Sequence, residues 1–205
     1  MNATPATAGR AVTSREAREL RRALGHFATG VTVVTCRRGS LLHGATVNSF
    51  TSVSLDPPLA LVALGRRTRA AALLDAGPYV VNLLGEDQRD LAVHFAGGPS
   101  AGAVPWVRPD GDRPRLGGTL GHLVCRPWRT YDGGDHTLHV GRVEEFAAGG
   151  GRPLLFYRGV FPRLMTEEDE RAGPGPDGST AVWSFCLDGP GPVREQFVTD
   201  HETRK

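Results

Sequence analysis

The pattern of hydrophobic and polar positions changes its period once, near residue 30. Before that point, Leu20, Leu24 and Phe27 recur at helical spacing. This spacing predicts a helix over residues 15–24, capped by Ser14, with one apolar face packed on the body of the protein. After that point, β-branched and aliphatic runs bounded by Gly, Pro or Asp predict strands. The predicted strands cover residues 31–36, 45–55, 59–64, 79–84, 120–131, 137–146 and 154–157.

Short helices and turns separate the predicted strands. Thr68 can cap a helix over residues 69–75, and a second short helix is predicted over residues 87–95. The sequence DGGD at 132–135 predicts a hairpin turn, and the Gly- and Pro-rich residues 97–118 predict a long surface loop. Mostly sequential strands with few helices favour an antiparallel barrel or sandwich over a βαβ fold.

One domain accounts for this pattern. A chain of 205 residues suits a single hydrophobic core, and a hydrophobic content of 40% argues against global disorder. We expect residues 1–13 to form a disordered tail and residues 14–164 to form the folded domain. Residues 165–205 are acidic and then rich in Gly and Pro, so we expect a linker and a C-terminal extension there.

Charge and cysteine content argue against several classes of function. The net charge of +2, without a dense Lys/Arg block, gives no reason to expect nucleic-acid binding. No apolar run approaches the roughly 18 residues of a membrane span, and residues 1–10 lack the apolar middle of a signal peptide. Cys36, Cys125 and Cys186 form no CxxC pair. We therefore expect no disulfide framework, no metal site and a cytoplasmic location.

The predicted strand at 46–54 is polar but carries no charge. In a regular strand, Thr46, Asn48, Phe50, Ser52 and Ser54 would share one face. Hydroxyl and amide groups can donate to a ligand rich in acceptor atoms without the cost of burying a charge. A ring system with a phosphate tail would suit such a strand. An ordinary solvated Ser/Thr-rich strand has the same pattern, so the pattern alone leaves both interpretations open.

Two turns carry further candidate groups. The GRRT segment at 65–68 follows a strand and begins a helix, which makes it a candidate anion site or a solvated basic turn. His136, beside the 132–135 turn, could contact a nucleotide, although a structural or exposed histidine is the simpler interpretation. His139 would face the opposite side of the strand, so the two histidines cannot bind one metal together.

The usual catalytic and dinucleotide motifs do not explain this chain. A G-x-G-x-x-G match at 173–178 contains two prolines and has no strand before it or helix after it, so we expect a linker there. The sequence has no HExxH motif. Hydride transfer needs no such motif, because the cofactor carries the reaction.

Five segments, in order along the chain, resemble the short-chain flavin reductases, which are the reductase components of two-component flavin-dependent monooxygenases. These segments are FATGVTVVT (27–35), TVNSFTSVSLDPPL (46–59), VNLL (81–84), GGDHT (133–137) and LLFYRG (154–159). Each is unspecific by itself, but the five in order are specific. The resemblance runs from about residue 20 to residue 164.

The resemblance implies a mainly β fold, the FMN-binding split β-barrel, which is antiparallel and Greek-key-like with a few short helices. It also implies a homodimer with flavin bound near the subunit interface. The implied flavin contacts are Thr46, Val47, Asn48 and Ser49, with Ser52 and Ser54 nearer the ribityl chain and phosphate. Further implied flavin positions are Arg66, Thr68, Asn82 and Phe95. The implied NAD(P)H positions are His136, Tyr157, Arg158 and Gly159.

The sequence departs from the family pattern at several places. Val47 stands where alanine is common, Thr68 where serine is common, and Pro78 where a basic or polar residue is frequent. The loop at 97–118 and the segment after residue 164 lie outside the pattern. These departures bear on loop contacts and on partner recognition rather than on the polar strand.

From this resemblance we expect an NAD(P)H:flavin oxidoreductase that supplies diffusible reduced flavin to a partner flavin-dependent monooxygenase. FAD and NADH are the favoured pair, with FMN and NADPH as alternatives. No evident Arg cluster for a 2′-phosphate lies beside His136, but Arg142 and Arg158 leave NADPH open. Two other functions remain possible on the same barrel: a non-catalytic flavin- or haem-binding module, and a flavin oxidase with its own substrate.

Overall fold

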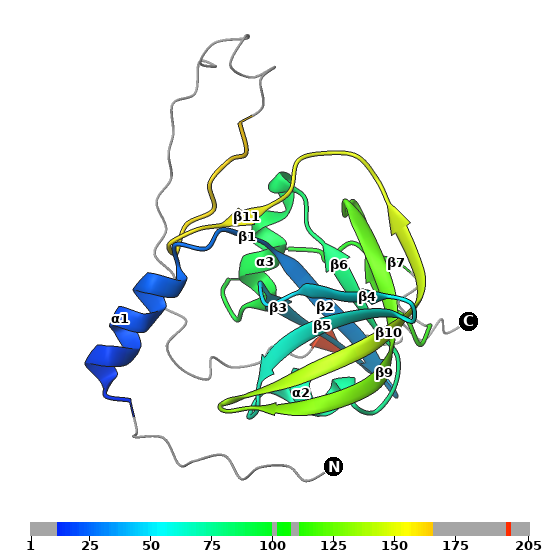
Figure 1. Cartoon of the computed structure of the whole chain (residues 1–205). Coiled ribbons are helices and arrows are strands. Elements are labelled where there is room, and N and C mark those ends of the chain that lie inside the picture. Colours follow the sequence, from blue (N-terminus) through cyan, green and yellow to red (C-terminus); the bar gives the residue numbers. More distant parts are fainter. Residues whose placement is uncertain (1–11, 100–101, 108–110, 166–195, 198–205) are drawn as a thin grey trace, which may run out of the picture.

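Antiparallel strands are the main elements of the computed structural model, which describes residues 12–99, 102–107, 111–165 and 196–197 (Figure 1). The helices are α1 (Ser14–Leu24), α2 (Arg69–Leu74) and α3 (Arg89–Phe95), with the 3-10 helix η1 (Glu86–Gln88) directly before α3. The strands are β1 (Thr29–Gly30), β2 (Thr32–Arg38), β3 (Leu41–Val47), β4 (Thr51–Leu55), β5 (Pro58–Gly65), β6 (Tyr79–Leu83), β7 (Trp106–Val107), β8 (Arg115–Leu116), β9 (Gly121–Gly133), β10 (His136–Ala148), β11 (Leu155–Phe156) and β12 (Gln196–Phe197). The predicted antiparallel, mainly β fold is confirmed.

The main sheet has the strand order β12-β3-β2-β6-β9-β10-β5-β4, with every pair antiparallel. Hairpins join β2 to β3, β4 to β5 and β9 to β10, while β6 inserts between β2 and β9. The strands β3 and β4 are consecutive in the chain but lie at distant places in the sheet order. The sheet therefore curls, so that the short link at 48–50 carries the chain from β3 to β4 alongside β5.

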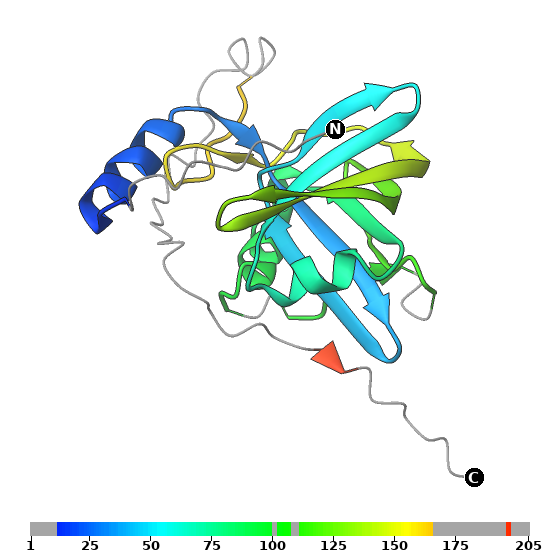
Figure 2. The same cartoon turned by 60° about the horizontal axis from the view of Figure 1, so that its bottom comes forward.

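Strand β2 is buried on both of its faces. Neighbouring residues of a strand point to opposite sides, so the two faces of β2 pack in different clusters. Val34 and Cys36 of β2 pack in a cluster with Leu74 of α2, and Cys125 of β9 joins the same cluster. Val33, on the other face of β2, packs with residues of α3 and β8. Figures 1 and 2 show α2 and α3 beside different parts of the sheet. Cys36 and Cys125 are free and buried.

Helix α1 differs from its prediction in two ways. Thr13, not Ser14, caps it, because Thr13 and Glu16 satisfy each other's backbone N–H groups in a reciprocal capping box. Its apolar face is also not packed on the body: Leu20 is 54% exposed, Leu24 64% and the following Phe27 78%. Both views show α1 standing at the side of the barrel (Figures 1 and 2).

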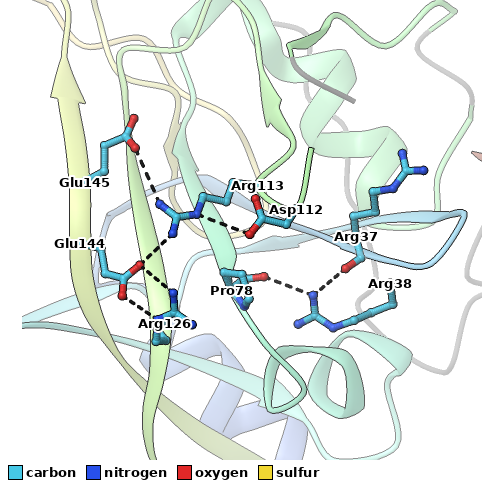
Figure 3. Close-up of polar contacts among 8 residues, drawn as sticks. All are labelled: Arg37, Arg38, Pro78, Asp112, Arg113, Arg126, Glu144 and Glu145. Atoms are coloured by element: carbon cyan, nitrogen blue, oxygen red, sulfur yellow. Dashed lines mark hydrogen bonds and ion pairs between the residues drawn. The ribbon is translucent and has the colours of Figure 1, made fainter. Parts of the chain in front are cut away.

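The predicted surface loop at 97–118 contains strands β7 and β8, which pair with each other. Arg113 fastens this segment to β10 through ion pairs with Glu144 and Glu145, as Figure 3 shows. Arg126 of β9 also contacts Glu144, at 2.6 Å. Nearby in the same view, Arg38 of β2 donates to the carbonyl of Pro78. The segment is thus held against the sheet by charge pairs as well as by packing.

Two further observations concern the limits of the described chain. No helix among the described residues is long and apolar enough to cross a membrane. The linker and C-terminal extension expected at residues 165–205 lie outside the described residues, except for Met165 and for β12, which pairs with the start of β3.

Candidate functional site

The polar segment at 46–54 is not one regular strand, which corrects the prediction for residues 45–55. Strand β3 ends at Val47 and β4 begins at Thr51. A register shift between Ser52 and Ser54 interrupts β4 as well. The single shared face expected for this segment therefore does not exist. The interruption arises because β3 pairs with β2 whereas β4 pairs with β5.

Ser49 lies at this break and bridges to β5. Its hydroxyl donates to the carbonyl oxygen of Ala63 at 2.8 Å and accepts from the amide of the same residue at 3.0 Å. One side chain thus makes both hydrogen bonds that a paired strand residue would make. Ser49 closes the barrel at the seam between β3 and β5, so its hydroxyl is already occupied.

The neighbouring predicted contacts are also partly committed to the fold. The Thr46 hydroxyl donates to the carbonyl of Ala92 in α3 at 2.6 Å. Val47 is buried in the core, and its carbonyl accepts from the Thr32 hydroxyl. Asn48, by contrast, is exposed. Of the four predicted ring contacts, Asn48 has the side chain most accessible to a ligand.

A cleft of about 390 Å³ opens beside Asn48. The volume falls in the lower part of the range for small-molecule sites, enough for a planar ring system. Most of its wall is apolar, with backbone-rich segments from β1 and from the residues before β11. The lining residues are Phe27, Ala28, Thr29, Gly30, Val31, Thr32, Asn48, Phe50, Leu83, Leu84, Leu120, Pro153 and Leu154.

The cleft has two features that suit a ligand with hydrogen-bonding edges. The Thr29 hydroxyl is shielded from solvent and has no hydrogen-bond partner among the described residues. A buried polar atom without a partner carries a free-energy cost that a ligand group could remove. Gly30 leaves open space where a side chain would stand. The FATG segment at 27–30 was noted in the sequence for its family resemblance, but its place in the cleft wall was not predicted.

The β9–β10 hairpin presents His136 at its tip. The turn is Gly134–Asp135, with Gly134 in the left-handed region at φ 79°. His136 is roughly half exposed, and its Nδ1 lies 2.7 Å from an oxygen of the Asp135 carboxylate. That contact lowers the pKa of the Asp135 carboxyl, and the charge of Arg21 on α1 lowers it further. A charged carboxylate favours a proton on Nδ1, and in the neutral ring Nε2 is then an acceptor.

His139 lies on the same strand but serves the fold. It is buried, and its Nδ1 lies 2.9 Å from the carboxylate of Asp75 at the end of α2. The two histidines are thus differently placed, as the strand spacing predicted. Among the described residues, no group of three or more potential ligands is arranged to hold a metal ion.

The turn at 65–68 lies against this hairpin. Arg66 donates through Nε to the carbonyl of Gly134 at 2.8 Å and pairs with Asp132 at 2.7 Å. Thr68 caps α2: its hydroxyl accepts from Ala71 N–H and donates to the carbonyl of Gly65. The predicted helix cap is confirmed, and the Thr68 hydroxyl already has both partners.

Asn82 and Phe95 both make contacts within the fold. Asn82 is 0% exposed, and its amide donates to Val33 and Thr35 and accepts from Leu116 N–H. The Asn82 side chain is thus fully engaged within the fold, and the predicted flavin contact stays a prediction. The Phe95 ring covers Gly44, where a Cβ would collide with it, and stacks edge-on against Trp106.

The remaining predicted residues lie on two exposed edges. Ser52 is exposed and Ser54 half-buried on β4, at the end of the sheet order. Tyr157 bonds to Val160 around a two-residue turn formed by Arg158 and Gly159, both in the left-handed region. The Arg158 amide donates to Gly25 at the end of α1, and the Tyr157 ring meets His26 edge-on. This turn therefore adjoins the segment that enters the cleft wall.

Comparison with known protein families gives a match over most of the described chain. A family model described as "Flavin reductase like domain" matches residues 24–165. An NADH-dependent flavin reductase from a Rhodococcus species is 45% identical over 152 residues, covering 71% of this chain and 85% of that protein. The reductase component of a 4-nitrophenol 4-monooxygenase/4-nitrocatechol 2-monooxygenase from Rhodococcus opacus is 41% identical over 149 residues, covering 72% and 80%.

Solved structures give the same result. The NADH:FAD oxidoreductase of Streptomyces globisporus C-1027, solved in complex with NAD and FAD fragments, superposes with a TM-score of 0.68. The identity is 36%, and the match covers 78% of this chain and all of that one. The fold and the sequence thus lead to the same set of relatives.

Proposed function

The chain belongs to the flavin reductase family, and from that premise we propose that it reduces free FAD or FMN with NADH or NADPH and passes the reduced flavin to a flavin-dependent monooxygenase. In this reaction NADH gives a hydride from its C4 to flavin N5, solvent supplies one proton, and NAD⁺ and reduced flavin are formed. The curated relatives are named as NADH-dependent enzymes or reductase components, which favours a reductase over a non-catalytic module.

The observation that carries this proposal is the cleft beside Asn48. Its volume and apolar wall suit a planar ring, and Thr29 is one of the residues that line it. Asn48 adds an amide at the exposed side of the cleft. Ser52 and Ser54 lie farther along the chain on β4, where we propose that they contact the ribityl chain and phosphate.

The proposed task of His136 is to orient the nicotinamide. With its Nδ1 proton held by Asp135, the imidazole can accept a hydrogen bond from a carboxamide N–H through Nε2. The turn of Tyr157, Arg158 and Gly159 is the other proposed nucleotide contact, because it adjoins the residues that enter the cleft wall. No side chain has to transfer a proton at the reacting atoms, so these groups act through position.

A steady-state assay that crosses NADH and NADPH with FAD, FMN and riboflavin tests the proposal. We expect oxidation of NADH only when free flavin is supplied, with a preference for NADH over NADPH. His136→Ala should raise the KM for NADH more than the KM for flavin. Tightly bound stoichiometric flavin that neither nucleotide reduces would instead indicate a carrier or sensor.

We further propose a homodimer. Leu20 and Leu24 of α1, together with Phe27 just after the helix, are apolar side chains that the described part of the same chain leaves exposed. A single exposed apolar side chain needs no explanation, but a contiguous face of this kind marks an interaction surface. Phe27 belongs both to this face and to the cleft wall, so a second subunit on α1 would adjoin the flavin site.

A further inference from the structure

Arg66 and the tip of the β9–β10 hairpin share three contacts. The backbone amide of Arg66 donates to the carbonyl of Asp135 at 2.9 Å. Its Nε donates to the carbonyl of Gly134 at 2.8 Å, and its Nη2 lies 2.7 Å from Oδ1 of Asp132. All three contacts fall within the four residues that end at Asp135, next to His136.

Apart from these contacts, the hairpin tip is held by strand pairing, in which His136 is opposite Gly65 of β5 and Gly133 of β9. Residues 128–136 are all exposed, so side-chain packing contributes little to their position. Within the tip, the Asp132 carboxylate accepts from Gly134 N–H at 2.8 Å, which shapes the turn. The Gly134 N–H and the Arg66 guanidinium both lower the pKa of the Asp132 carboxyl, so the ion pair is present at neutral pH.

We propose that Arg66 is a positioning residue for the nicotinamide hairpin: by holding Asp132 and Gly134 it fixes the turn that orients Asp135 and His136. This inference rests on the proposed role of His136. It also reassigns Arg66, which the family resemblance made a flavin contact. The turn at 65–68 then couples the helix that follows β5 to the nucleotide side of the site.

The chemistry of the guanidinium distinguishes the two roles. A phosphate would have to compete with Asp132 for Nη2, because that carboxylate already neutralises the charge at short distance. Nε points to the Gly134 carbonyl and not to solvent-borne anions. Arg67, the next residue, is also exposed but makes no polar contact with this hairpin in the described part of the chain, so it provides a matched control.

The test compares R66A, R66K, D132N and the double variant R66A/D132N with R67A in the full chain. We expect R66A and D132N each to raise the KM for NADH about fivefold, as loss of an exposed charge-assisted hydrogen bond would. The dissociation constant for flavin, measured by fluorescence quenching, should stay within about twofold, which is a span that exposed substitutions commonly produce. The double variant should be no worse than R66A, because both changes remove one interaction.

Two readouts distinguish failure of this inference from failure of the proposed function. Hydrogen exchange of a peptide spanning residues 130–138 should accelerate in R66A and stay unchanged in R67A, whether or not the protein turns over. Partial recovery in R66K is expected, because lysine can pair with Asp132 but cannot also reach Gly134 in the same geometry. Unchanged exchange in R66A, or a weakened flavin affinity with an unchanged KM for NADH, would overturn the inference. Absence of NADH-driven flavin reduction in the unmodified protein would instead refute the proposed function.

Discussion

At the scale of single residues, the polar segment at 46–54 divides its side chains between fold and ligand. The hydroxyl of Ser49 is hydrogen-bonded to the backbone of β5, and that of Thr46 to the backbone of α3. Asn48, two positions from Thr46, keeps its amide at the cleft. The segment is therefore polar for two reasons, and only one of them concerns binding.

Replacing Ser49 by alanine should weaken the barrel seam. The change leaves the N–H and C=O of Ala63 without their partner, so the free energy of unfolding should fall by about 1–3 kcal/mol. Ser52→Ala, on an exposed position of β4, is the control and should change stability by less than about 0.5 kcal/mol. Urea unfolding followed by circular dichroism measures both. Equal stability of the two variants would contradict the closing role of Ser49.

His43 should make stability depend on pH. Burial, and then the charge of Arg69, lower its pKa from 6.5 to about 4 in the folded chain. The unfolded chain binds a proton first, so this stability is complete above pH 6.5 and is lost as the pH falls toward 4. The loss should reach about 3 kcal/mol. In His43→Gln, the slope of unfolding free energy between pH 7 and 4 should flatten; an unchanged slope would exclude this source.

At the scale of elements, local sequence patterns predicted most helices, strands and turns but did not predict how these elements pack against one another. The cap at Thr68 and the hairpin turn at 132–135 are encoded by adjacent residues, and both are found. The break at 48–50 depends on Ala63, fourteen residues beyond Ser49, so no local pattern could reveal it. The exposed face of α1 was missed for a similar reason, since helical spacing identifies an apolar face but not what covers it.

The candidate site was predictable to the same degree. Residue type and family resemblance identified Asn48 and His136, whose side chains are indeed accessible. They also selected Asn82, because an amide in a strand has the same chemistry whether it faces a ligand or the core. Only the position of Leu116 and Thr35 around it shows which one applies.

Substitutions of Asn82 and Asn48 can distinguish a structural asparagine from a ligand-binding one. Asn82→Ala should lower the free energy of unfolding by about 3 kcal/mol, because it leaves the Leu116 N–H buried without a partner and opens a cavity. Asn48→Ala should leave stability within about 0.5 kcal/mol and raise the KM for flavin. Denaturant unfolding and the steady-state assay, applied to both variants, give the comparison. An Asn82 variant of normal stability with weakened flavin binding would instead support the predicted flavin contact of Asn82.

At the scale of the whole molecule, the apolar face of α1 is the feature that one chain leaves incomplete. Leu24→Glu should place a charge in the proposed interface and shift the protein from dimer to monomer in analytical ultracentrifugation. Arg18→Gln, on an exposed position of the same helix, should leave the dimer intact. Because Phe27 lines the cleft, we expect the Leu24 variant also to bind flavin more weakly. A monomeric unmodified protein would refute the dimer.

The burial of Cys36 and Cys125 has a consequence for the proposed reaction. Reduced flavin that escapes its partner reacts with dioxygen to give oxidised flavin and hydrogen peroxide, so such an enzyme works in the presence of its own oxidant. Burial raises the pKa of Cys36 to about 11 and that of Cys125 to about 12. Peroxide attacks thiolates rather than thiols, and at neutral pH these two groups remain protonated and shielded. We therefore expect the thiols of Cys36 and Cys125 to resist oxidation by the hydrogen peroxide that forms during turnover.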